Sequence, residues 1–149
     1  MPDDVTIRGH EPADRAAWEP LFRGYIEFYQ AAVADDVIGE TWARLLSPEP
    51  EFHIGLGAVD GEGRLVGIAH ILFHRSTWSK SCYCYLEDLF VDPSARARGI
   101  GRKLIEAVYA EADRRGATRT YWATQEFNYR ARALYDQVAT KSPFIQYRR

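Results

Sequence analysis

The sequence predicts an α/β protein in which a mixed β-sheet carries helices on both faces. In the first half of the chain, strand-like segments flank a hairpin signal, which is typical of antiparallel strands. In the second half, strand-like and helix-like segments alternate, which is typical of βαβ units. The predicted order is β, α, α, β, β, β, α, β, α, β, so a mostly antiparallel first part leads into a βαβαβ part.

The length and composition indicate a single domain over residues 1–149. Of the 149 residues, 46% are hydrophobic and 27% are charged, as in an ordinary globular domain. A chain of this length buries roughly 68–70% of the surface of its unfolded form, which is enough for a core without disulfides. There is no internal repeat, low-complexity tract or long linker.

Charge and hydropathy exclude several classes of protein. A formal net charge of −2 gives no general attraction for nucleic acid, so we expect no nucleic-acid partner. The longest nearly apolar stretch, Val66 to Phe73, is interrupted by Gly67 and His70 and is too short to span a bilayer. Because the opening Met1-Pro-Asp-Asp is acidic and polar, we expect no targeting peptide, no membrane partner and a cytoplasmic location.

The first three predicted elements are a strand and two helices. Val5–Arg8 is a short strand, and Ala13–Ala32 carries apolar residues at helical spacing, with Asp14 as its expected cap. Ile38–Leu46 is predicted as a shorter helix, which Ser47-Pro-Glu-Pro ends.

Three strands are predicted next. Phe52–Val59 and Leu65–Phe73 flank Asp60-Gly-Glu-Gly, a hairpin turn signal, and Tyr83–Val91 is the third strand. These three segments predict an antiparallel meander.

The remaining elements alternate between helix and strand. A helix after position 101 is predicted from an apolar stripe that ends at Arg114-Arg115-Gly116, a helix stop signal. The stripe consists of Leu104, Ile105, Val108, Tyr109 and Ala112. Arg119–Thr124 is then predicted as a strand, Asn128–Val138 as a helix and Phe144–Tyr147 as a final strand.

The junction between the third meander strand and the following helix has the features of a phosphate-binding loop. The strand ends at Asp92-Pro93, the loop contains Gly99 and Gly101, and the helix begins at once, so backbone N–H groups and the helix N-terminus can face an anion. Four cations lie within eight residues: Arg96, Arg98, Arg102 and Lys103. We therefore expect a polyphosphate ligand, although a solvated loop with a basic rim would have the same composition.

Common nucleotide-binding motifs do not fit this loop. The dinucleotide fingerprint requires glycine at position 104, where Leu104 stands, and the P-loop spacing with its Lys-Ser/Thr is missing. The glycine loop of kinases lies between two strands rather than between a strand and a helix.

Three segments together resemble the GNAT superfamily of N-acetyltransferases. Arg96-x-x-Gly99-x-Gly101 resembles its acetyl-CoA pyrophosphate loop, and Tyr85-Leu-Glu-Asp-Leu-Phe-Val resembles its fourth strand. Asn128-x-x-Ala131-x-x-Leu134-Tyr135 is similar to its late helix. The similarity is close from Tyr83 to the C-terminus and looser from Val5 to His74. The resemblance implies the GNAT acyl-CoA N-acyltransferase fold and acetyl-CoA as the co-substrate.

Two branches of the superfamily are similar to this sequence. Leu-Glu-Asp followed by two apolar residues and Val resembles the diamine and thialysine acetyltransferases. The ending, from Tyr121-Trp-Ala-Thr-Gln-Glu to Pro143-Phe-Ile-Gln-Tyr-Arg, is similar to a fungal branch described as acetylating histone tails, polyamines or D-amino acids. The branches agree on the chemistry and differ in the acceptor.

The resemblance implies direct attack of a primary amine on the thioester, without an acyl-enzyme. Tyr135 corresponds to the tyrosine near the sulfur and is our expected acid, although it also belongs to an apolar helical stripe. Glu87 is the expected base, directly or through water. Asp88 faces the opposite side in a regular strand, and a bulge would change which of the two enters the site.

The resemblance also implies a set of cofactor contacts. We expect main-chain groups on the strand to pair with pantetheine, those of the loop to hold the pyrophosphate, and the late helix to face the thioester. The expected cofactor-binding residues are Leu89, Phe90, Val91, Arg96, Ala97, Arg98, Gly99, Ile100, Gly101, Arg102, Asn128, Ala131 and Tyr135. Asn128 is also a plausible helix cap.

The first helix supplies candidate acceptor contacts, because the diamine branch uses this region for the amine. Tyr25, Glu27 and Tyr29 would join Glu87 and Asp88 as substrate-binding residues, since aromatic faces and carboxylates suit a cation. An aromatic stripe of this kind is also typical of a core.

We expect no metal or redox cofactor. Cys82 and Cys84 alternate along a predicted strand, and two thiols cannot complete a zinc site. The four histidines do not have the spacing of metal ligands and are assigned no chemistry: His10, His53, His70 and His74.

The function predicted from the sequence is that of an acetyl-CoA-dependent N-acetyltransferase acting on a small primary amine such as a polyamine, lysine analogue or amino acid. Two alternatives stay open: acetylation of protein or histone lysine, and a non-catalytic acetyl-CoA sensor. The resemblance further implies a homodimer, formed by pairing or exchange of C-terminal strands.

Overall fold

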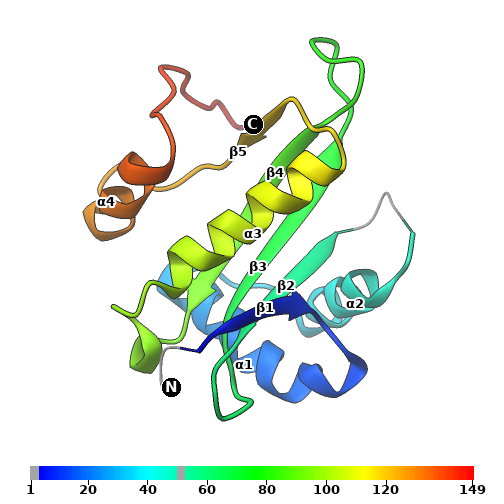
Figure 1. The fold of residues 1–149 in the computed structure, drawn as a ribbon, viewed down its shortest axis with the longest axis vertical. Helices are drawn as coiled ribbons and strands as arrows, with labels where there is room; N and C mark the ends of the chain where they lie inside the picture. Colours follow the sequence, from blue (N-terminus) through cyan, green and yellow to red (C-terminus); the bar gives the residue numbers. More distant parts are fainter. Residues whose placement is uncertain (1–3, 50–52) are drawn as a thin grey trace.

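A five-stranded sheet forms the centre of the computed structural model, which describes residues 4–49 and 53–149 (Figure 1). The strands lie in the order β1-β2-β3-β4-β5. Neighbours are antiparallel from β1 to β4, whereas β5 runs parallel to β4. The predicted mixed sheet is confirmed, with strands β1 (Thr6–Gly9), β2 (Ile54–Val59), β3 (Leu65–His74), β4 (Tyr83–Val91) and β5 (Arg119–Tyr121).

Helices cover both faces of this sheet. In Figure 1, α3 crosses one face, α1 and α2 lie on the other, and α4 stands beyond β5. In the described part of the chain, no helix has both the length and the apolar character needed to cross a bilayer. The α-helices are α1 (Arg15–Phe28), α2 (Asp35–Leu46), α3 (Ile100–Arg114) and α4 (Tyr129–Val138), and short 3₁₀ turns span Pro12–Asp14 and Pro93–Ala95.

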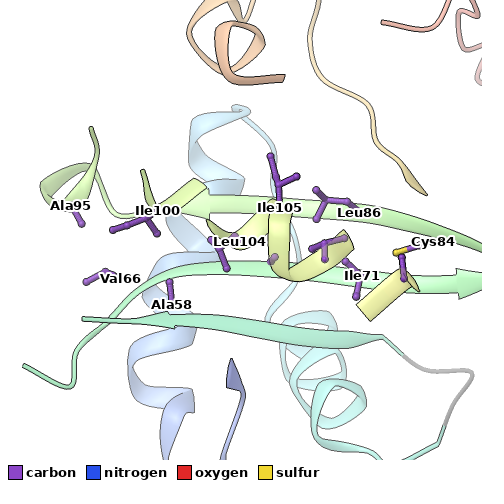
Figure 2. Packing of buried hydrophobic residues seen from close by; sticks show 12 residues of the cluster. Ala58, Val66, Ile71, Cys84, Leu86, Ala95, Ile100, Leu104 and Ile105 are labelled. Carbon is purple, nitrogen blue, oxygen red and sulfur yellow. The ribbon is translucent and has the colours of Figure 1, made fainter. Parts of the chain in front are cut away.

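Each face of the sheet has its own hydrophobic core. On the α3 face, Leu104, Ile105 and Val108 are fully buried against strand residues such as Ile71 and Leu86 (Figure 2). The apolar stripe predicted for this helix is therefore its buried face.

The second core lies between the sheet and the first two helices. Trp18, Phe22 and Trp42 pack there against Ile68 of β3 and Phe90 of β4. The aromatic stripe of α1 is thus divided: its first half is core, and its last residues extend beyond it.

A bulge changes the direction of side chains along β4. Ile71 pairs with Leu86, but His70 pairs with Asp88, so Glu87 is the extra residue between the two pairs. As a result Leu86 lies in the α3 core, whereas Phe90 lies in the α1–α2 core.

The first helix differs from its prediction at both ends. It stops at Phe28 instead of continuing to Ala32, because Gln30 has a left-handed backbone with φ 53°. Asp14 stands at the N-cap position but makes no capping hydrogen bond to α1 within the described chain. Its carboxylate instead accepts hydrogen bonds from the Arg8 guanidinium and from the Glu11 N–H.

Two strand predictions were longer than the strands observed, and one was wrong. β5 ends at Tyr121 rather than Thr124, and β2 begins at Ile54, so that His53 is not part of it. Phe52, the predicted start of β2, lies outside the described residues. Phe144–Tyr147 forms no strand, and the side chains of Phe144, Ile145 and Tyr147 are 87%, 79% and 89% exposed. The alternating pattern gave this segment strand character, but a strand also requires a paired edge and a surface to pack on.

Candidate active site

A cavity of about 630 Å³ lies beside the end of β4. Four segments form its wall: the end of α1, the last residues of β4, the loop that leads into α3, and α4. Of the residues predicted for the site, those in the lining are Tyr25, Tyr29, Leu89, Phe90, Val91, Arg96, Ala97, Gly99, Ile100, Gly101, Arg102, Asn128, Ala131 and Tyr135. Glu27, Glu87, Asp88 and Arg98 were also predicted but are not part of the lining.

The cavity exists because β4 and β5 separate. Their pairing begins at Tyr83 with Arg119 and ends at Tyr85 with Tyr121, while β4 continues to Val91. Beyond Tyr85, the β4 edge on this side has no strand partner in the described part of the chain, so alternate backbone groups are left for a ligand. An extended chain of amides could pair with this edge as an added strand would.

The loop after β4 forms a concave turn of backbone. Asp92 starts it, because its Oδ1 accepts hydrogen bonds from the N–H and the hydroxyl of Ser94, both at 2.9 Å. Ala97 and Gly99 have left-handed backbones with φ of 66° and 73°, and Gly99 is the N-cap of α3. For Ala97 this conformation costs about 1 kcal/mol. The unpaired N–H groups of the first helical turn and the helix dipole make this end of α3 suitable for a phosphate.

Three arginines line the cavity, one each from this loop, α3 and α4. Arg96 donates from Nε to the Val91 carbonyl at 3.1 Å and lies over the Phe90 ring, so it also supports the cavity wall. Arg102 binds the side chain of Gln137 across to α4. Arg130 was not predicted, although a cation in the first turn of a helix opposes the helix dipole, and this unusual position could have identified it.

The first turn of α4 is fixed by Asn128. Its Oδ1 accepts a hydrogen bond from the Ala131 N–H at 3.3 Å, so the predicted cap is confirmed. The C-terminal end of the helix is held by the Tyr109 hydroxyl, which donates to the Val138 carbonyl at 2.8 Å. Asn128 and Ala131 both line the cavity.

Tyr135 lies one turn further along α4. It lines the cavity, packs edge-on against Trp122 at 5.3 Å between ring centroids and is half-buried. Burial, with a smaller effect from Tyr29, raises the pKa of Tyr135 to about 12. The phenol therefore keeps its proton throughout the neutral range and can act as a donor inside the cavity.

The two neighbouring carboxylates of β4 have different surroundings. Glu87, the bulged residue, is exposed, whereas the side chain of Asp88 is 18% exposed and points to the α1 face of the sheet. In a regular strand, Asp88 would share the face of Leu86, so the bulge is what moves it toward α1.

A buried histidine accompanies Asp88, and sequence reasoning missed it. His70 is 1% exposed, its Nδ1 lies 2.8 Å from Asp88 Oδ2, and its Nε2 accepts from Trp18 Nε1 at 2.9 Å. Neither spacing nor motif indicates this contact, since the three residues come from α1, β3 and β4. A histidine within an otherwise apolar stretch of the strand is the only local sign.

The aromatic residues of α1 form the wall opposite β4. The Tyr25 hydroxyl donates to the Glu87 carbonyl at 3.4 Å, and its ring packs edge-on against Tyr29. Burial first, then the charge of Asp88, raises the pKa of Tyr25. Glu27 points elsewhere, into a separate hollow between α1 and α2.

Comparison with known proteins identifies related sequences and structures. The model of the acetyltransferase (GNAT) family matches residues 16–139. The D-amino-acid N-acetyltransferase HPA3 of Saccharomyces cerevisiae is 36% identical over 147 residues, which covers 99% of this chain and 91% of that protein. The thialysine N-epsilon-acetyltransferase of Bos taurus is 39% identical over 77 residues, covering 52% of this chain and 45% of that protein.

A solved structure of similar fold contains CoA. The aminoglycoside N-acetyltransferase AAC(6')-Iy in complex with CoA superposes with a TM-score of 0.80 at 19% identity, covering 97% of this chain and 93% of that one.

Proposed function

The chain belongs to the GNAT acetyltransferase family and is an N-acetyltransferase, and from this premise we propose that it transfers acetyl from acetyl-CoA to the primary amine of a small molecule. One observation carries the proposal: the open edge of β4, the cradle at the start of α3 and the Tyr135 phenol line one cavity. We further propose that residues 1–149 work as one catalytic domain.

The cavity residues fit the parts of acetyl-CoA. The main chain of Ala97 to Arg102 would hold the pyrophosphate, with Arg102 and Arg130 adding positive charge. The open backbone edge from Leu89 to Val91 would pair with the pantetheine amides. When bound, acetyl-CoA supplies the acetyl group as a thioester.

The acceptor arrives as an ammonium ion, because an alkylamine has a pKa of about 10.4. Glu87 and Asp88 would attract this cation, and Glu87, directly or through water, would accept its proton. The freed nitrogen attacks the thioester carbonyl, which backbone N–H groups of β4 polarise, and the C–N bond forms as the C–S bond breaks. Tyr135 would donate its proton to the departing thiolate. The nitrogen loses its second proton as the amide forms, and through water that proton would restore the Tyr135 phenol, while the proton taken by the carboxylate is released to solvent.

Two features support a small amine as acceptor. Tyr25 and Tyr29 form an aromatic wall beside the carboxylates, which suits an alkylammonium ion. The yeast relative, which covers nearly the whole chain, is named for D-amino acids, and the bovine one for thialysine. The proposed acceptor site consists of Tyr25, Tyr29, Glu87 and Asp88, without Glu27.

The assay that tests this function is release of CoA thiol from acetyl-CoA. Polyamines, lysine, thialysine, D- and L-amino acids and a basic peptide are offered as separate acceptors. We expect release only with a small amine; release with the peptide alone would transfer the proposal to protein lysine. If the protein binds acetyl-CoA but releases no CoA with any acceptor, the proposal that the cavity is an active site is wrong.

Variants locate the chemistry in the cavity. Tyr135→Phe is expected to lower kcat by about a hundredfold, as typical for loss of a general acid, with unchanged affinity for acetyl-CoA. Glu87→Gln and Asp88→Asn are expected to lower kcat/KM for the amine. Tyr129→Phe is the matched control, because Tyr129 is an exposed tyrosine of the same helix outside the cavity lining.

A further inference from the structure

Three side chains from separate elements form a buried hydrogen-bonded series. Trp18 of α1 donates from Nε1 to His70 Nε2 at 2.9 Å, and His70 Nδ1 lies 2.8 Å from Asp88 Oδ2 on β4. Trp18 is fully buried and His70 is 1% exposed, so water does not compete for these bonds. Phe22 packs edge-on against the imidazole, with ring centroids 5.0 Å apart.

The donors and acceptors define where the imidazole proton lies. An indole N–H can only donate, so His70 Nε2 must offer a lone pair to Trp18. In a neutral imidazole the proton is then on Nδ1, which donates to the Asp88 carboxylate. Trp18 therefore selects the Nδ1–H tautomer of His70, and in this tautomer the Asp88 carboxylate accepts the Nδ1–H hydrogen bond.

The β4 bulge brings the carboxylate to this histidine. His70 and Asp88 are paired residues on the α1 face, one position beyond the register shift. One carboxylate oxygen is held by His70, while the side chain as a whole keeps 18% of its surface exposed. Tyr25, which lines the cavity, donates to the adjacent Glu87 carbonyl, and burial, together with the charge of Asp88, raises the pKa of Tyr25.

We infer that His70 is a positioning residue for acetyl transfer: it holds the Asp88 carboxylate in one orientation, as an acceptor, next to Leu89 of the cavity lining, with Trp18 fixing the imidazole tautomer. This inference rests on the proposed function, because it gives Asp88 the role of binding the acceptor's ammonium group. His70, which is not part of the cavity lining, would thus contribute to the preference for a cationic acceptor.

Two substitutions of His70 separate its two hydrogen bonds. The amide nitrogen of asparagine lies near the place of Nδ1, so His70→Asn keeps a donor toward Asp88. The longer side chain of glutamine reaches the place of Nε2, so His70→Gln keeps a partner for Trp18 and loses the bond to Asp88.

We expect His70→Gln to lower kcat/KM for the amine by about tenfold to a hundredfold, the effect of losing a hydrogen bond to a charged group. The KM for acetyl-CoA should stay unchanged, and His70→Asn should retain most of the activity. His53→Gln, at a histidine before β2 and outside the cavity lining, is the control. Equal losses in both His70 variants, or a matching rise in the KM for acetyl-CoA, would mean that His70 only supports the fold.

A spectroscopic measurement on the unmodified chain covers the case in which the variants do not fold. In ¹⁵N-histidine NMR of the full-length protein, His70 should be in the Nδ1–H form. An Nε2–H form would overturn the inference. This measurement is independent of turnover: absence of acceptor-dependent CoA release would refute the proposed function, while the tautomer would still decide whether His70 holds Asp88.

Discussion

Tyr135 owes its protonation state to its surroundings. Its pKa is raised to about 12, mainly by burial, so the phenol stays protonated well above the range in which an exposed tyrosine ionises. We predict that kcat/KM rises with pH as the free amine becomes available and does not fall up to about pH 10.5. A pH–rate profile of the wild-type protein measures this. A descending limb with a pKa near 10 that disappears in Tyr135→Phe would contradict the prediction.

His10 is a second residue whose pKa is changed by its surroundings. Its two ring nitrogens are buried without a hydrogen-bond partner among the described residues, and Gly55 and Gly57 leave room for the ring. Burial, with a smaller effect from His70, lowers the pKa of His10 to about 4. The unfolded chain, with a histidine pKa of about 6.5, therefore binds more protons than the folded one between pH 6.5 and 4.

The consequence is a loss of stability in acid. We predict that this residue alone lowers the free energy of unfolding by about 3 kcal/mol as the pH falls from 7 to 4. Urea unfolding at several pH values measures the loss, and His10→Leu should show a smaller one. Asp14 does not account for this window, because its pKa is lowered to about 2, chiefly by the Arg8 guanidinium. An equal pH dependence in His10→Leu would show that another group is responsible.

Among the elements, the turn before α3 depends most on a single backbone conformation. Gly99 has φ 73°, and a side chain there would meet no atom within 4 Å, so conformation rather than space favours glycine. Gly63, with φ 80°, makes the same demand in the hairpin between β2 and β3, away from the cavity.

This pair allows a matched test of the phosphate cradle. We predict that Gly99→Val raises the Kd for acetyl-CoA by roughly tenfold, which corresponds to about 1.4 kcal/mol of backbone strain. Gly63→Val should cost comparable stability and leave the Kd unchanged. Calorimetric titration of both variants with acetyl-CoA measures the two Kd values. Equal Kd values would show that the turn before α3 does not contribute to acetyl-CoA binding.

How far the sequence predicts an element depends on whether its determinants are local. The α3 stripe and the cap at Asn128 follow from residue spacing, and both are confirmed. The choice between Glu87 and Asp88 was open because it depends on a bulge, which arises from pairing with β3 and leaves no local signal. The contact of His70 with Trp18 joins residues 52 positions apart, beyond the reach of any periodicity.

At the scale of the whole molecule, the C-terminal segment has strand character but pairs with no strand of the residues that the structure describes. Phe144, Ile145 and Tyr147 are almost fully exposed, and the sheet ends nearby at β5 (Figure 1). We propose that a second copy of the chain covers these side chains, because large exposed apolar groups in series are typical of an interface. The wrong strand prediction would then describe the dimer rather than the single chain.

Light scattering tests this proposal directly. We predict a dimer for the full chain and a monomer for a chain that ends at Ser142, which removes the exposed residues and leaves the cavity lining complete. A full-length protein that stays monomeric at high micromolar concentration would contradict it.

The strand order of the sheet has a consequence for how the protein folds. Neighbours in the sheet follow the order of the chain, and the meander β2-β3-β4 is continuous over residues 54–91. Its hairpins close short loops, so the meander can form before α1 and α2 bring β1 to one edge and α3 brings β5 to the other. We therefore expect the open end of β4 to form early in folding, before the helices that complete the cavity have docked.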